Sequence, residues 1–278
     1  MAYLEIRSVH KSFARSHRFA AQSSGRLAVL RDINLAINQN EFVCIVGCSG
    51  SGKTTLISLI AGLIEPDAGE ILLEGKAIAG PGPDRGIVFQ NYSLLPWMTV
   101  FENVYLAVEA VAPHVHETEK RQRTEHYIHL VNLGAAMKKV PRELSGGMRQ
   151  RVAVARGLAM DPKVLLLDEP FSALDALTRG TLQEELARIW METQKTVVMI
   201  TNDIDEAILL ADSVYTLTGG SGTTLGHAVH VDTPHPRSRA ELNGEPSYQQ
   251  VRRETISILS RERKNTLVRP EQKGVLLN

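Results

Sequence analysis

Long hydrophobic runs are missing from this sequence. A membrane-spanning helix needs about 20 consecutive apolar residues, and the longest candidate, LISLIAGLI at 56–64, is much shorter. The N-terminus, MAYLEIRSVHKSF, lacks the apolar region of a secretory signal peptide. We therefore expect a soluble, cytoplasmic chain that is held at a membrane only by a partner.

Cysteine is also scarce, with Cys44 and Cys48 as the only two. No His or Cys cluster lies near them in the sequence, so neither a zinc site nor a structural disulfide is indicated. We expect a reducing compartment, with Cys44 as a small core residue in a strand. Cys48 falls inside a phosphate-loop pattern, at a position where that pattern does not restrict the residue type.

The sequence also has no excess of positively or negatively charged residues. Lys plus Arg and Asp plus Glu both number 31, so the formal net charge is zero. This balance does not indicate a nucleic-acid partner, although it leaves a local basic patch open. The 278 residues, 43% of them hydrophobic, suffice for one large globular domain or for a domain with an appended subdomain.

Strand-like and helix-like segments alternate through the first three quarters of the chain. The strand-like segments are 2–7, 33–46, 86–90, 163–170, 196–200 and 213–217. Helical spacing of apolar residues occurs in 101–133 and in 178–193, where the large apolar residues share one face. This alternation predicts an α/β fold with a mainly parallel sheet.

Three segments lack a clear pattern. Residues 14–26 are polar and basic, which favours a solvated loop over a recognition element. The glycine-rich stretch 219–226 predicts a flexible loop. Beyond it, residues 248–263 are compatible with one helix, and the segment from Lys264 onward is expected to be a loose tail.

The segment GCSGSGKTT follows the buried strand-like run EFVCIV. Gly47, Gly52, Lys53 and Thr54 match the phosphate-loop pattern, whose glycines let backbone N–H groups surround phosphate oxygens at a helix N-terminus. We expect Lys53 to reach the β- and γ-phosphates of a nucleotide and Thr54 to offer its hydroxyl to Mg²⁺. The alternative is a merely glycine-rich turn, which this context disfavours.

A pair of acids ends the apolar run VLLLDE. Carboxylates at that position do not pack in a core, so Asp168 is a candidate Mg²⁺ ligand through water, and Glu169 a candidate base for the attacking water. The pair alone is a weak signal, because acids often end strands. Together with the phosphate loop it is a strong one.

A second anion-binding device is indicated in LSGGMRQRVAVARGLA at 144–159. Ser145, Gly146 and Gly147 open a helix, and small residues at a helix N-terminus suit an anion. One phosphate loop already serves one nucleotide, so this second cradle suggests a composite site between two subunits. The alternative is that Ser145 is only an N-cap.

Taken together and in order, the motifs GCSGSGKTT, VFQ, LSGGMRQR, LLLDEP, SALD and DEA resemble the ATP-binding subunit of ABC transporters over roughly residues 2–218. The resemblance implies an α/β P-loop ATPase fold with an antiparallel β subdomain and a helical subdomain at about 91–160. Residues 219–278 then form a partly flexible C-terminal extension. It further implies a head-to-tail dimer with two ATP molecules held between the subunits.

The resemblance assigns roles to individual residues. Glu169, Gln90 and Asn202 are implied to be catalytic, and Thr54, Gln90 and Asp168 to bind Mg²⁺. Phe13 matches the aromatic residue that stacks on adenine, with core packing as its alternative, and Asp175 would lie at the dimer seam. The implied ATP-binding residues are Phe13, Gly47, Cys48, Ser49, Gly50, Ser51, Gly52, Lys53, Thr54, Thr55, Ser145, Gly146, Gly147 and Asp175.

One branch of the family is most similar: importers of nitrate, bicarbonate, sulfonates and similar small solutes. RGIVFQNYSLLPWMTVFENV at 85–104 carries this similarity. It implies permease subunits as partners, with Leu95 and Trp97 as candidates for the permease contact or, alternatively, for core packing. It also implies a periplasmic solute-binding protein, a position on the cytoplasmic face of the inner membrane, and nitrate or nitrite as first cargo with bicarbonate second.

Asn202 departs from the family pattern, which usually has a histidine at this position. An amide can donate to the γ-phosphate but cannot become a cation, so we expect a slowed ATPase site, in a dimer with an unlike ATPase chain. The alternatives are that Asn202 substitutes adequately, or that the chain is a largely non-hydrolytic regulatory subunit paired with a more active one.

Overall fold

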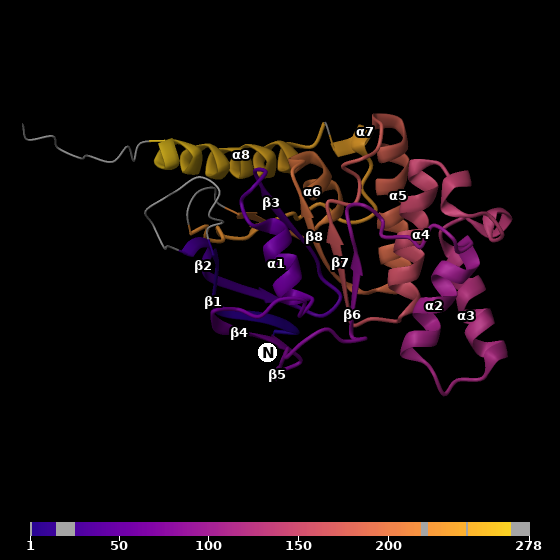
Figure 1. The fold of residues 1–278 in the computed structure, drawn as a ribbon. Helices are drawn as coiled ribbons and strands as arrows, with labels where there is room; N and C mark the ends of the chain where they lie inside the picture. Colours follow the sequence, from indigo (N-terminus) through magenta and orange to yellow (C-terminus); the bar gives the residue numbers. More distant parts are fainter. Residues whose placement is uncertain (1, 15–25, 218–221, 243, 268–278) are drawn as a thin grey trace, which may run out of the picture.

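The computed structural model describes residues 2–14, 26–217, 222–242 and 244–267 (Figure 1). The predicted insertion at 14–26 and the predicted tail from Lys264 fall mostly outside the described residues, and the predicted loop at 219–226 falls partly outside them. In chain order the helices and strands are β1 (Leu4–Ala14), β2 (Arg26–Ile37), β3 (Phe42–Gly47), α1 (Lys53–Ile60), β4 (Ala68–Leu73), β5 (Lys76–Ala77), β6 (Arg85–Val88), α2 (Val100–Val111), α3 (Glu117–Leu130), α4 (Gly146–Ala159), β7 (Val164–Asp168), α5 (Ala176–Thr193), β8 (Thr196–Thr201), α6 (Ile204–Leu210), β9 (Ser213–Leu217), β10 (Val229–His230), α7 (Arg239–Leu242) and α8 (Pro246–Leu267).

Two sheets form the scaffold. The larger has six strands in the order β10-β9-β3-β8-β7-β6, and its neighbours pair in parallel except for β10 with β9. The smaller is antiparallel, in the order β2-β1-β4-β5. The α/β class, the mainly parallel sheet and the antiparallel β subdomain are therefore confirmed, whereas β4, β5 and β10 were not predicted.

Strand β3 explains how the larger sheet is covered on both faces. Val43 and Ile45 join a core with α1 and the antiparallel sheet. Phe42, Cys44 and Val46 point the other way, into a core that includes residues of α4, α5 and α6. A parallel strand buried on both faces requires such a continuous apolar run. The prediction that Cys44 is a core residue is confirmed, since its side chain is fully buried.

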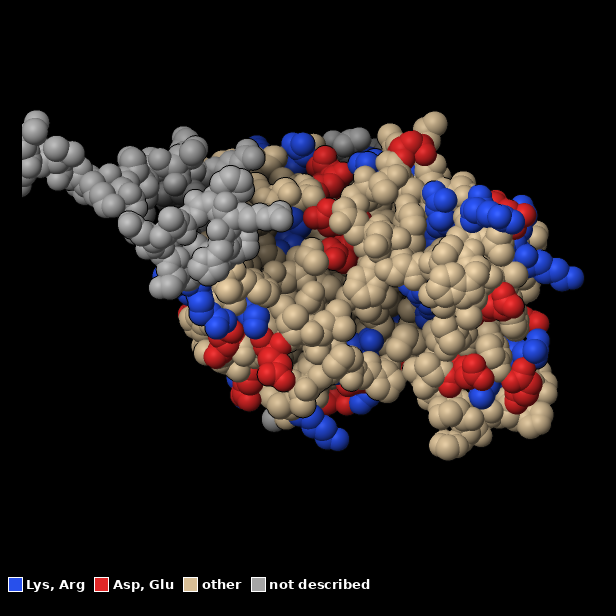
Figure 2. Space-filling model, viewed as in Figure 1, with Lys and Arg blue, Asp and Glu red and all other residues tan. Residues whose placement is uncertain are grey.

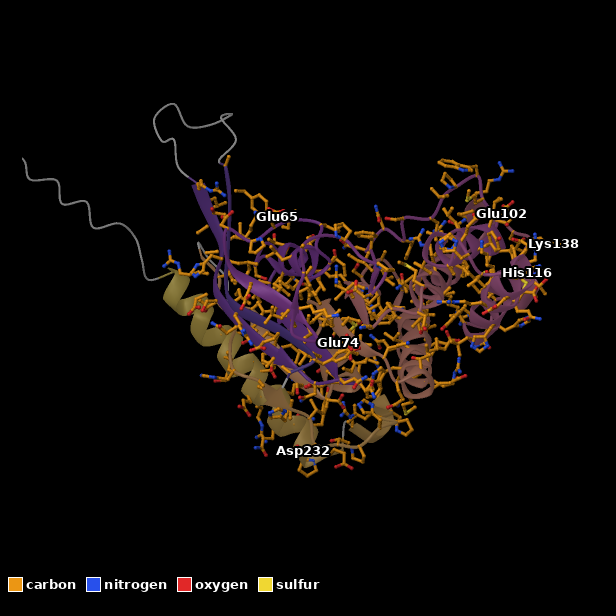
Figure 3. The ribbon with its side chains drawn as sticks, turned by 90° about the horizontal axis from the view of Figure 1, so that it is seen from below. Glu65, Glu74, Glu102, His116, Lys138 and Asp232 are labelled. Atoms are coloured by element: carbon orange, nitrogen blue, oxygen red, sulfur yellow. The ribbon has the colours of Figure 1, made fainter. Side chains whose placement is uncertain are left out.

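The helices α2, α3 and α4 pack together beside the larger sheet (Figure 1). The predicted helical stretch at 101–133 is correct in type, but it consists of two helices. Thr99 and Glu102 form a capping box at the start of α2, and Pro113, which has no backbone N–H, lies in the break before α3. Figure 3 shows Glu102, His116 and Lys138 on this helical side, far from Glu65 and Glu74.

The C-terminal helix α8 runs along the molecule and packs on α6, β9 and β10 (Figure 1). It includes the predicted helix at 248–263 and extends it at both ends. Figure 2 shows charged side chains of both signs interspersed over the face in view. Within the described ranges, no helix has the length and apolar character needed to cross a membrane.

Candidate active site

The candidate site lies at the ends of three neighbouring strands of the larger sheet. Strands β3, β8 and β7 are adjacent and parallel, so their carboxyl ends lie at one edge. Val46 of β3 pairs with Thr201 of β8, and Ile200 of β8 pairs with Asp168 of β7. The residues that follow these strands, the phosphate loop, Asn202 and Glu169, therefore meet at this edge.

The phosphate loop connects β3 to α1. Gly50 and Gly52 have left-handed backbones, with φ of 80° and 93°, which glycine adopts without a steric penalty. Gly52 carries no side-chain cap, so the first N–H groups of α1 remain available for an anion. The other predicted residues of this segment lie at the end of β3, in the loop or in the first turn of α1: Gly47, Cys48, Ser49, Ser51, Thr54 and Thr55.

Lys53 is buried beneath this loop, with 4% of its surface exposed. Its Nζ donates to the carbonyl oxygens of Gly47 at 2.9 Å and Cys48 at 3.0 Å. Ser51 Oγ is buried without a hydrogen-bond partner among the described residues. A buried cation, an unpaired hydroxyl and uncapped helix N–H groups at one loop fit a polyphosphate, because each of them is satisfied by anionic oxygens.

Asn202 lies between Lys53 and Glu169. Its Oδ1 accepts from Lys53 Nζ at 2.7 Å, and its Nδ2 donates to Glu169 Oε1 at 2.9 Å. Lys53 Nζ is also 3.3 Å from the same Glu169 oxygen. One carboxamide therefore connects the cation of the phosphate loop to the candidate base, using both its donor and its acceptor.

Asp168 and Thr54 form the candidate magnesium pair. Thr54 Oγ1 donates to Asp168 Oδ1 at 3.3 Å. Burial raises the pKa of the Asp168 carboxyl, and the hydrogen bond from Thr54 opposes that effect. No group of three or more His, Cys, Asp or Glu in the described part of the chain is arranged to hold a metal ion. One carboxylate and one hydroxyl fit Mg²⁺, which takes its other ligands from substrate phosphates and water.

The backbone of Glu169 is strained. Its φ is 44°, in the left-handed region that non-glycine residues seldom adopt, and its N–H donates to Ile200 O at 3.0 Å. Gln90 reaches this residue indirectly: Gln90 Nε2 donates to Ser172 Oγ at 3.1 Å, and that hydroxyl donates to Glu169 O at 2.9 Å. Ser172 was not singled out from the sequence, although it stands in the SALD motif.

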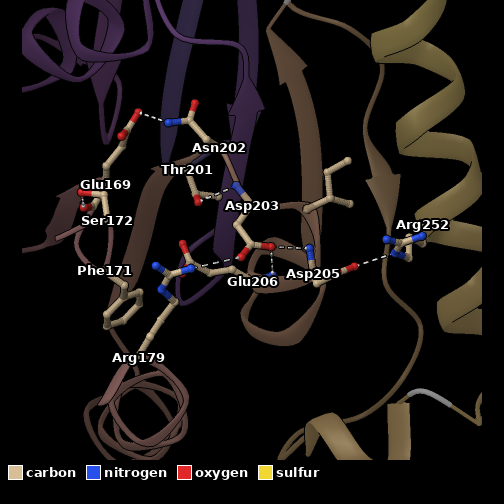
Figure 4. Close-up of a pocket in the computed structure, with 11 residues that line it drawn as sticks. Glu169, Phe171, Ser172, Arg179, Thr201, Asn202, Asp203, Asp205, Glu206 and Arg252 are labelled. Atoms are coloured by element: carbon tan, nitrogen blue, oxygen red, sulfur yellow. Dashed lines mark hydrogen bonds and ion pairs between the residues drawn. The ribbon is translucent and has the colours of Figure 1, made fainter. Parts of the chain in front are cut away.

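A cavity of about 390 Å³ opens beside Glu169 and Asn202 (Figure 4). Two cations, Arg179 of α5 and Arg252 of α8, also line it, and neither was predicted as a site residue. Arg179 follows closely after SALD, so the motif offered a signal. For Arg252 the sequence gives none, because α8 is distant from the motifs along the chain.

Phe13 stands at the end of β1 with 42% of its surface exposed, so the alternative of core packing is wrong. Lys11 Nζ lies 5.6 Å from the centre of its ring. Asp67 ties down this strand end by accepting from the backbone N–H of Ser12 at 2.7 Å and from Arg26 at 2.9 Å. The aromatic ring is therefore presented to solvent by a fixed strand end, as a base-stacking surface requires.

Ser145 lies apart from Lys53. It is the N-cap of α4 and accepts from Met148 N at 3.2 Å, so the hydrogen bond of the simple N-cap alternative is present. A Cβ on Gly147 would be 2.7 Å from Thr178 Cγ2, which explains this glycine sterically. Ser145 and Gly147 border a separate hollow of about 190 Å³, and Figure 1 shows α4 among α2, α3 and α5, away from α1.

Two further predicted residues are also outside the Lys53 cluster. Asp175 is the N-cap of α5, and the N–H of Thr178, which donates to it at 3.0 Å, lowers its pKa. Gly146 is the first residue of α4. The single chain therefore groups Lys53, Thr54, Asp168, Glu169 and Asn202, and leaves the 145–147 segment and Asp175 elsewhere.

Trp97 is exposed over 72% of its surface, so core packing is wrong for this residue. Leu95 is half-buried, and its N–H donates to Asn103 Oδ1 at 2.8 Å. A large exposed aromatic ring held by an ordered loop is typical of a contact surface.

Comparisons with known proteins agree with this geometry. Residues 30–172 match the family model described as "ABC transporter". The chain is 48% identical to the nitrate import ATP-binding protein NrtD of Synechococcus elongatus, with 85% of this chain and 86% of that protein aligned.

Two longer relatives match over part of their length. The nitrate import ATP-binding protein NrtC of Synechococcus elongatus is 50% identical over 94% of this chain, and the bicarbonate transport ATP-binding protein CmpC of Synechocystis is 51% identical over 88%. The chain spans only 39% and 37% of their lengths, respectively.

A solved structure supports the fold. The dimeric, post-hydrolysis state of the ATP-binding cassette MJ0796, bound to ADP and Pi, superposes with a TM-score of 0.70 at 29% identity. The match covers 83% of this chain and all of that one.

Proposed function

This chain belongs to the ABC transporter family and carries its ATPase domain, and on that basis we propose that it is the MgATP-hydrolysing subunit of an importer for a small inorganic anion. Nitrate or nitrite is the first choice of cargo and bicarbonate the second, because relatives at similar identity carry both names. The cargo does not touch this subunit, so no residue here selects it.

The observation that carries the proposal is the position of Asn202 between Lys53 and Glu169. When a nucleotide binds, Lys53 exchanges its carbonyl and amide acceptors for β- and γ-phosphate oxygens. Glu169 accepts a hydrogen bond from the attacking water and takes up its proton as the water oxygen bonds to the γ-phosphorus. The bond from the γ-phosphorus to the β–γ bridging oxygen breaks in the same step, and ADP and inorganic phosphate are released. Asn202 holds the carboxylate in place and donates to the γ-phosphate, where negative charge develops.

Thr54, Asp168 and Gln90 are the residues that would hold Mg²⁺. The ion supplies charge neutralisation on the β- and γ-phosphate oxygens. The Thr54–Asp168 pair already brings one hydroxyl and one carboxylate together. Gln90 is connected to Glu169 by two hydrogen bonds through Ser172. Its side chain would be the third protein group that holds the ion.

The active unit of the proposal is a head-to-tail dimer. The two anion-binding devices of one chain lie apart, so Ser145–Gly147 of a second ATPase subunit, an unlike chain, would close over the nucleotide bound at Lys53. Asp175 would lie at that seam. MJ0796 crystallised as a dimer in this fold. The ATPase domain then comprises residues 2–218, with the helical subdomain at about 91–160 and residues 219–278 as an extension.

The permease contact of the proposal is centred on Trp97. Permease subunits would dock there and hold the chain at the cytoplasmic face of the inner membrane, with a periplasmic solute-binding protein acting on the far side. Closure of the ATPase dimer and its reopening after hydrolysis would then drive the permease between its two states.

A second candidate function is favoured by one observation, the presence of asparagine rather than histidine at position 202. In that alternative the chain binds nucleotide but hydrolyses little, and an unlike partner chain performs most of the turnover. The nucleotide then acts as a structural or regulatory ligand.

The two candidates differ in the effect of Glu169→Gln on a purified transport complex. If this chain is the hydrolysing subunit, Glu169→Gln should abolish both ATP hydrolysis and anion uptake. The matched control is Glu192→Gln on α5, an exposed residue whose carboxylate pairs, among the described residues, only with Arg188 one turn away; activity should be retained. Near-normal turnover in the Glu169→Gln complex would favour the regulatory candidate. Stimulation of the ATPase by nitrate or by bicarbonate identifies the cargo.

A further inference from the structure

Helix α6 follows Asn202 closely in the sequence. It is only seven residues long, Ile204–Leu210. Its N-cap is Asp203, whose side chain accepts from the N–H groups of Asp205 at 2.9 Å and Glu206 at 3.1 Å. A helix of this length is not stable by itself in water. Its position, and with it the position of Asn202, depends on the elements that hold it.

The first turn of α6 is held by α8. Asp205 Oδ1 accepts from Tyr248 OH at 2.8 Å. The same oxygen accepts from Arg252 Nε at 2.7 Å (Figure 4). Tyr248 is 5% exposed. Asp205 and Arg252 line the same cavity as Glu169 and Asn202. Two donors from one helix therefore converge on one carboxylate oxygen.

The last turn of α6 is held by Arg237. Its guanidinium donates to Ile208 O at 2.8 Å and Ala211 O at 2.6 Å, and also to Thr233 O and Val231 O. Terminal helix carbonyls lack partners within the helix, and a cation at this end suits the helix dipole. Burial lowers the pKa of Arg237 to about 10, which leaves it charged at neutral pH.

A third link passes through α5. Arg239 donates to Gln183 Oε1 at 2.5 Å, and Gln183 Nε2 donates to Glu206 Oε2 at 2.6 Å. Gln183 is fully buried and Glu206 is 3% exposed. The backbone N–H of Asp203, the N-cap of α6, donates to Thr201 Oγ1 at 3.0 Å, and Thr201 is the residue before Asn202. This link therefore runs from the C-terminal segment through α5 to α6, whose N-cap contacts the end of β8.

We propose that residues 229–267 form a C-terminal clamp that positions Asn202 by holding α6 at both ends, with Tyr248 and Arg252 as positioning residues that act through Asp205. The inference rests on the proposed ATPase function. It gives a role to a segment in which the sequence showed no motif. Loss of the clamp loosens α6, so Asn202 no longer holds Glu169 in the geometry that the attacking water requires.

The test measures kcat and KM for MgATP in the purified complex with Arg252→Ala and Tyr248→Phe. Misplacement of a catalytic group by about 1 Å can lower the rate about 10²-fold, so we expect kcat to fall at least about tenfold, with little change in KM. Arg252→Lys should restore part of the loss. The matched control is Arg253→Ala, because Arg253 Nε donates only to Gln249 O of its own helix, and its kcat should be unchanged.

A double-mutant cycle separates positioning from general destabilisation. In the Asn202→Ala background, the clamp has no carboxamide left to position, so adding Arg252→Ala should change kcat less than twofold. If Arg252→Ala lowers the yield of folded chain, Tyr248→Phe carries the same cycle, because it removes only a hydroxyl.

Three outcomes overturn the inference. An undiminished loss in the Asn202→Ala background shows that Arg252 does not act through Asn202. Unchanged kcat in both clamp variants, in a complex whose activity Glu169→Gln abolishes, overturns the clamp alone and leaves the proposed function standing. A wild-type complex without ATPase activity overturns the proposed function and the inference with it.

Discussion

The side-chain amide of Asn202 donates a 2.9 Å hydrogen bond to Oε1 of Glu169. The same side chain accepts from Lys53, so both of its polar atoms are engaged within the site. A residue in this position fixes the direction of the carboxylate even where it cannot supply a positive charge. The account of this protein depends on that relationship.

Asn202→Ala removes both hydrogen bonds and leaves the Glu169 carboxylate with the 3.3 Å ion pair to Lys53 as its remaining contact among the described residues. We expect kcat for ATP hydrolysis to fall about 10²-fold, the usual effect of losing one preorganised donor. Steady-state kinetics on the purified complex measure it. Asn91→Ala is a suitable control, because Asn91 lies in the loop after Gln90 and its side chain accepts only from Ser93. A loss of less than twofold in Asn202→Ala would contradict the assigned role.

Asn202→His introduces a side chain that can carry a charge. An imidazole has an unperturbed pKa of about 6.5, whereas a carboxamide does not titrate. We expect kcat to rise and to acquire a dependence on pH between about 6 and 7 that the natural protein lacks, with the higher rate on the acidic side. A pH–rate profile of both proteins checks this. An unchanged rate and profile would mean that asparagine substitutes fully for histidine.

The carboxyl group of Asp67, next to the antiparallel sheet, makes the free energy of unfolding depend on pH. The hydrogen bonds from Ser12 lower the pKa of its carboxyl to about 2, from an ordinary value of 3.8. Because the folded-state pKa is depressed, this contribution to stability is present above pH 3.8 and is lost as the pH falls through about 2. Asp67→Asn should therefore be less stable at neutral pH and lose less stability on acidification.

Denaturant unfolding at several pH values between 2 and 5 measures this difference. The control is Glu70→Gln, since Glu70 on the same sheet pairs only with exposed Arg7. A profile for Asp67→Asn as steep as that of the natural protein would contradict the role of Asp67.

Trp97→Ala tests the permease surface. A central aromatic anchor contributes about 2 kcal/mol or more to an interface, so we expect association with the permease subunits to weaken about 30-fold. Co-purification from detergent-solubilised membranes reports this, and nucleotide binding by the isolated chain should not change. Leu106→Ala on α2 is the control, because Leu106 is also an exposed apolar residue, with 41% of its area accessible. Equal effects of the two variants would argue against a specific anchor at Trp97.

Gly147→Ala tests the second anion cradle. The added Cβ would approach Thr178 to 2.7 Å and displace the start of α4. We expect the variant to bind one nucleotide at Lys53 with normal affinity and to lose ATP-dependent dimerisation, which size-exclusion chromatography with light scattering measures. Gly180→Ala is the control, because a Cβ there meets no heavy atom within 4 Å. Normal dimerisation of Gly147→Ala would show that the steric fit at α4 is not required.

Local sequence predicted much of the site because its residues follow buried strands directly. Cys44 and its neighbours form a run that only a strand covered on both faces accommodates, and the acids after β7 stand at the edge where parallel strands end. The phosphate loop could also be predicted from the sequence, because its backbone needs positive φ angles that glycine adopts without a steric penalty and few other residues do.

The contacts that the sequence did not reveal join segments far apart in the chain. Asp205 and Arg252 are 47 positions apart, and neither belongs to a periodic pattern or motif that pairs it with the other. Strands β5 and β10 escaped prediction because edge strands of two residues carry no apolar periodicity. Strand β4 lies inside its sheet, but its first three residues are exposed and only its last three are buried, which leaves no alternating pattern. The exposure of Trp97 could not be predicted either, since an apolar residue in the segment between β6 and α2 fits a core and a docking surface equally well.

The most direct test of the account is photo-crosslinking with an ATP analogue that carries an aryl azide on its γ-phosphate, bound at Lys53 of the Glu169→Gln complex, in which hydrolysis is blocked. One ATPase subunit is isotopically labelled, so that mass spectrometry identifies which chain carries each modified peptide. The account predicts that Lys53→Ala abolishes all labelling and that the nucleotide of one subunit modifies the peptide containing Ser145–Gly147 of the other. Modification confined to the subunit that binds the nucleotide would contradict a site shared between two chains.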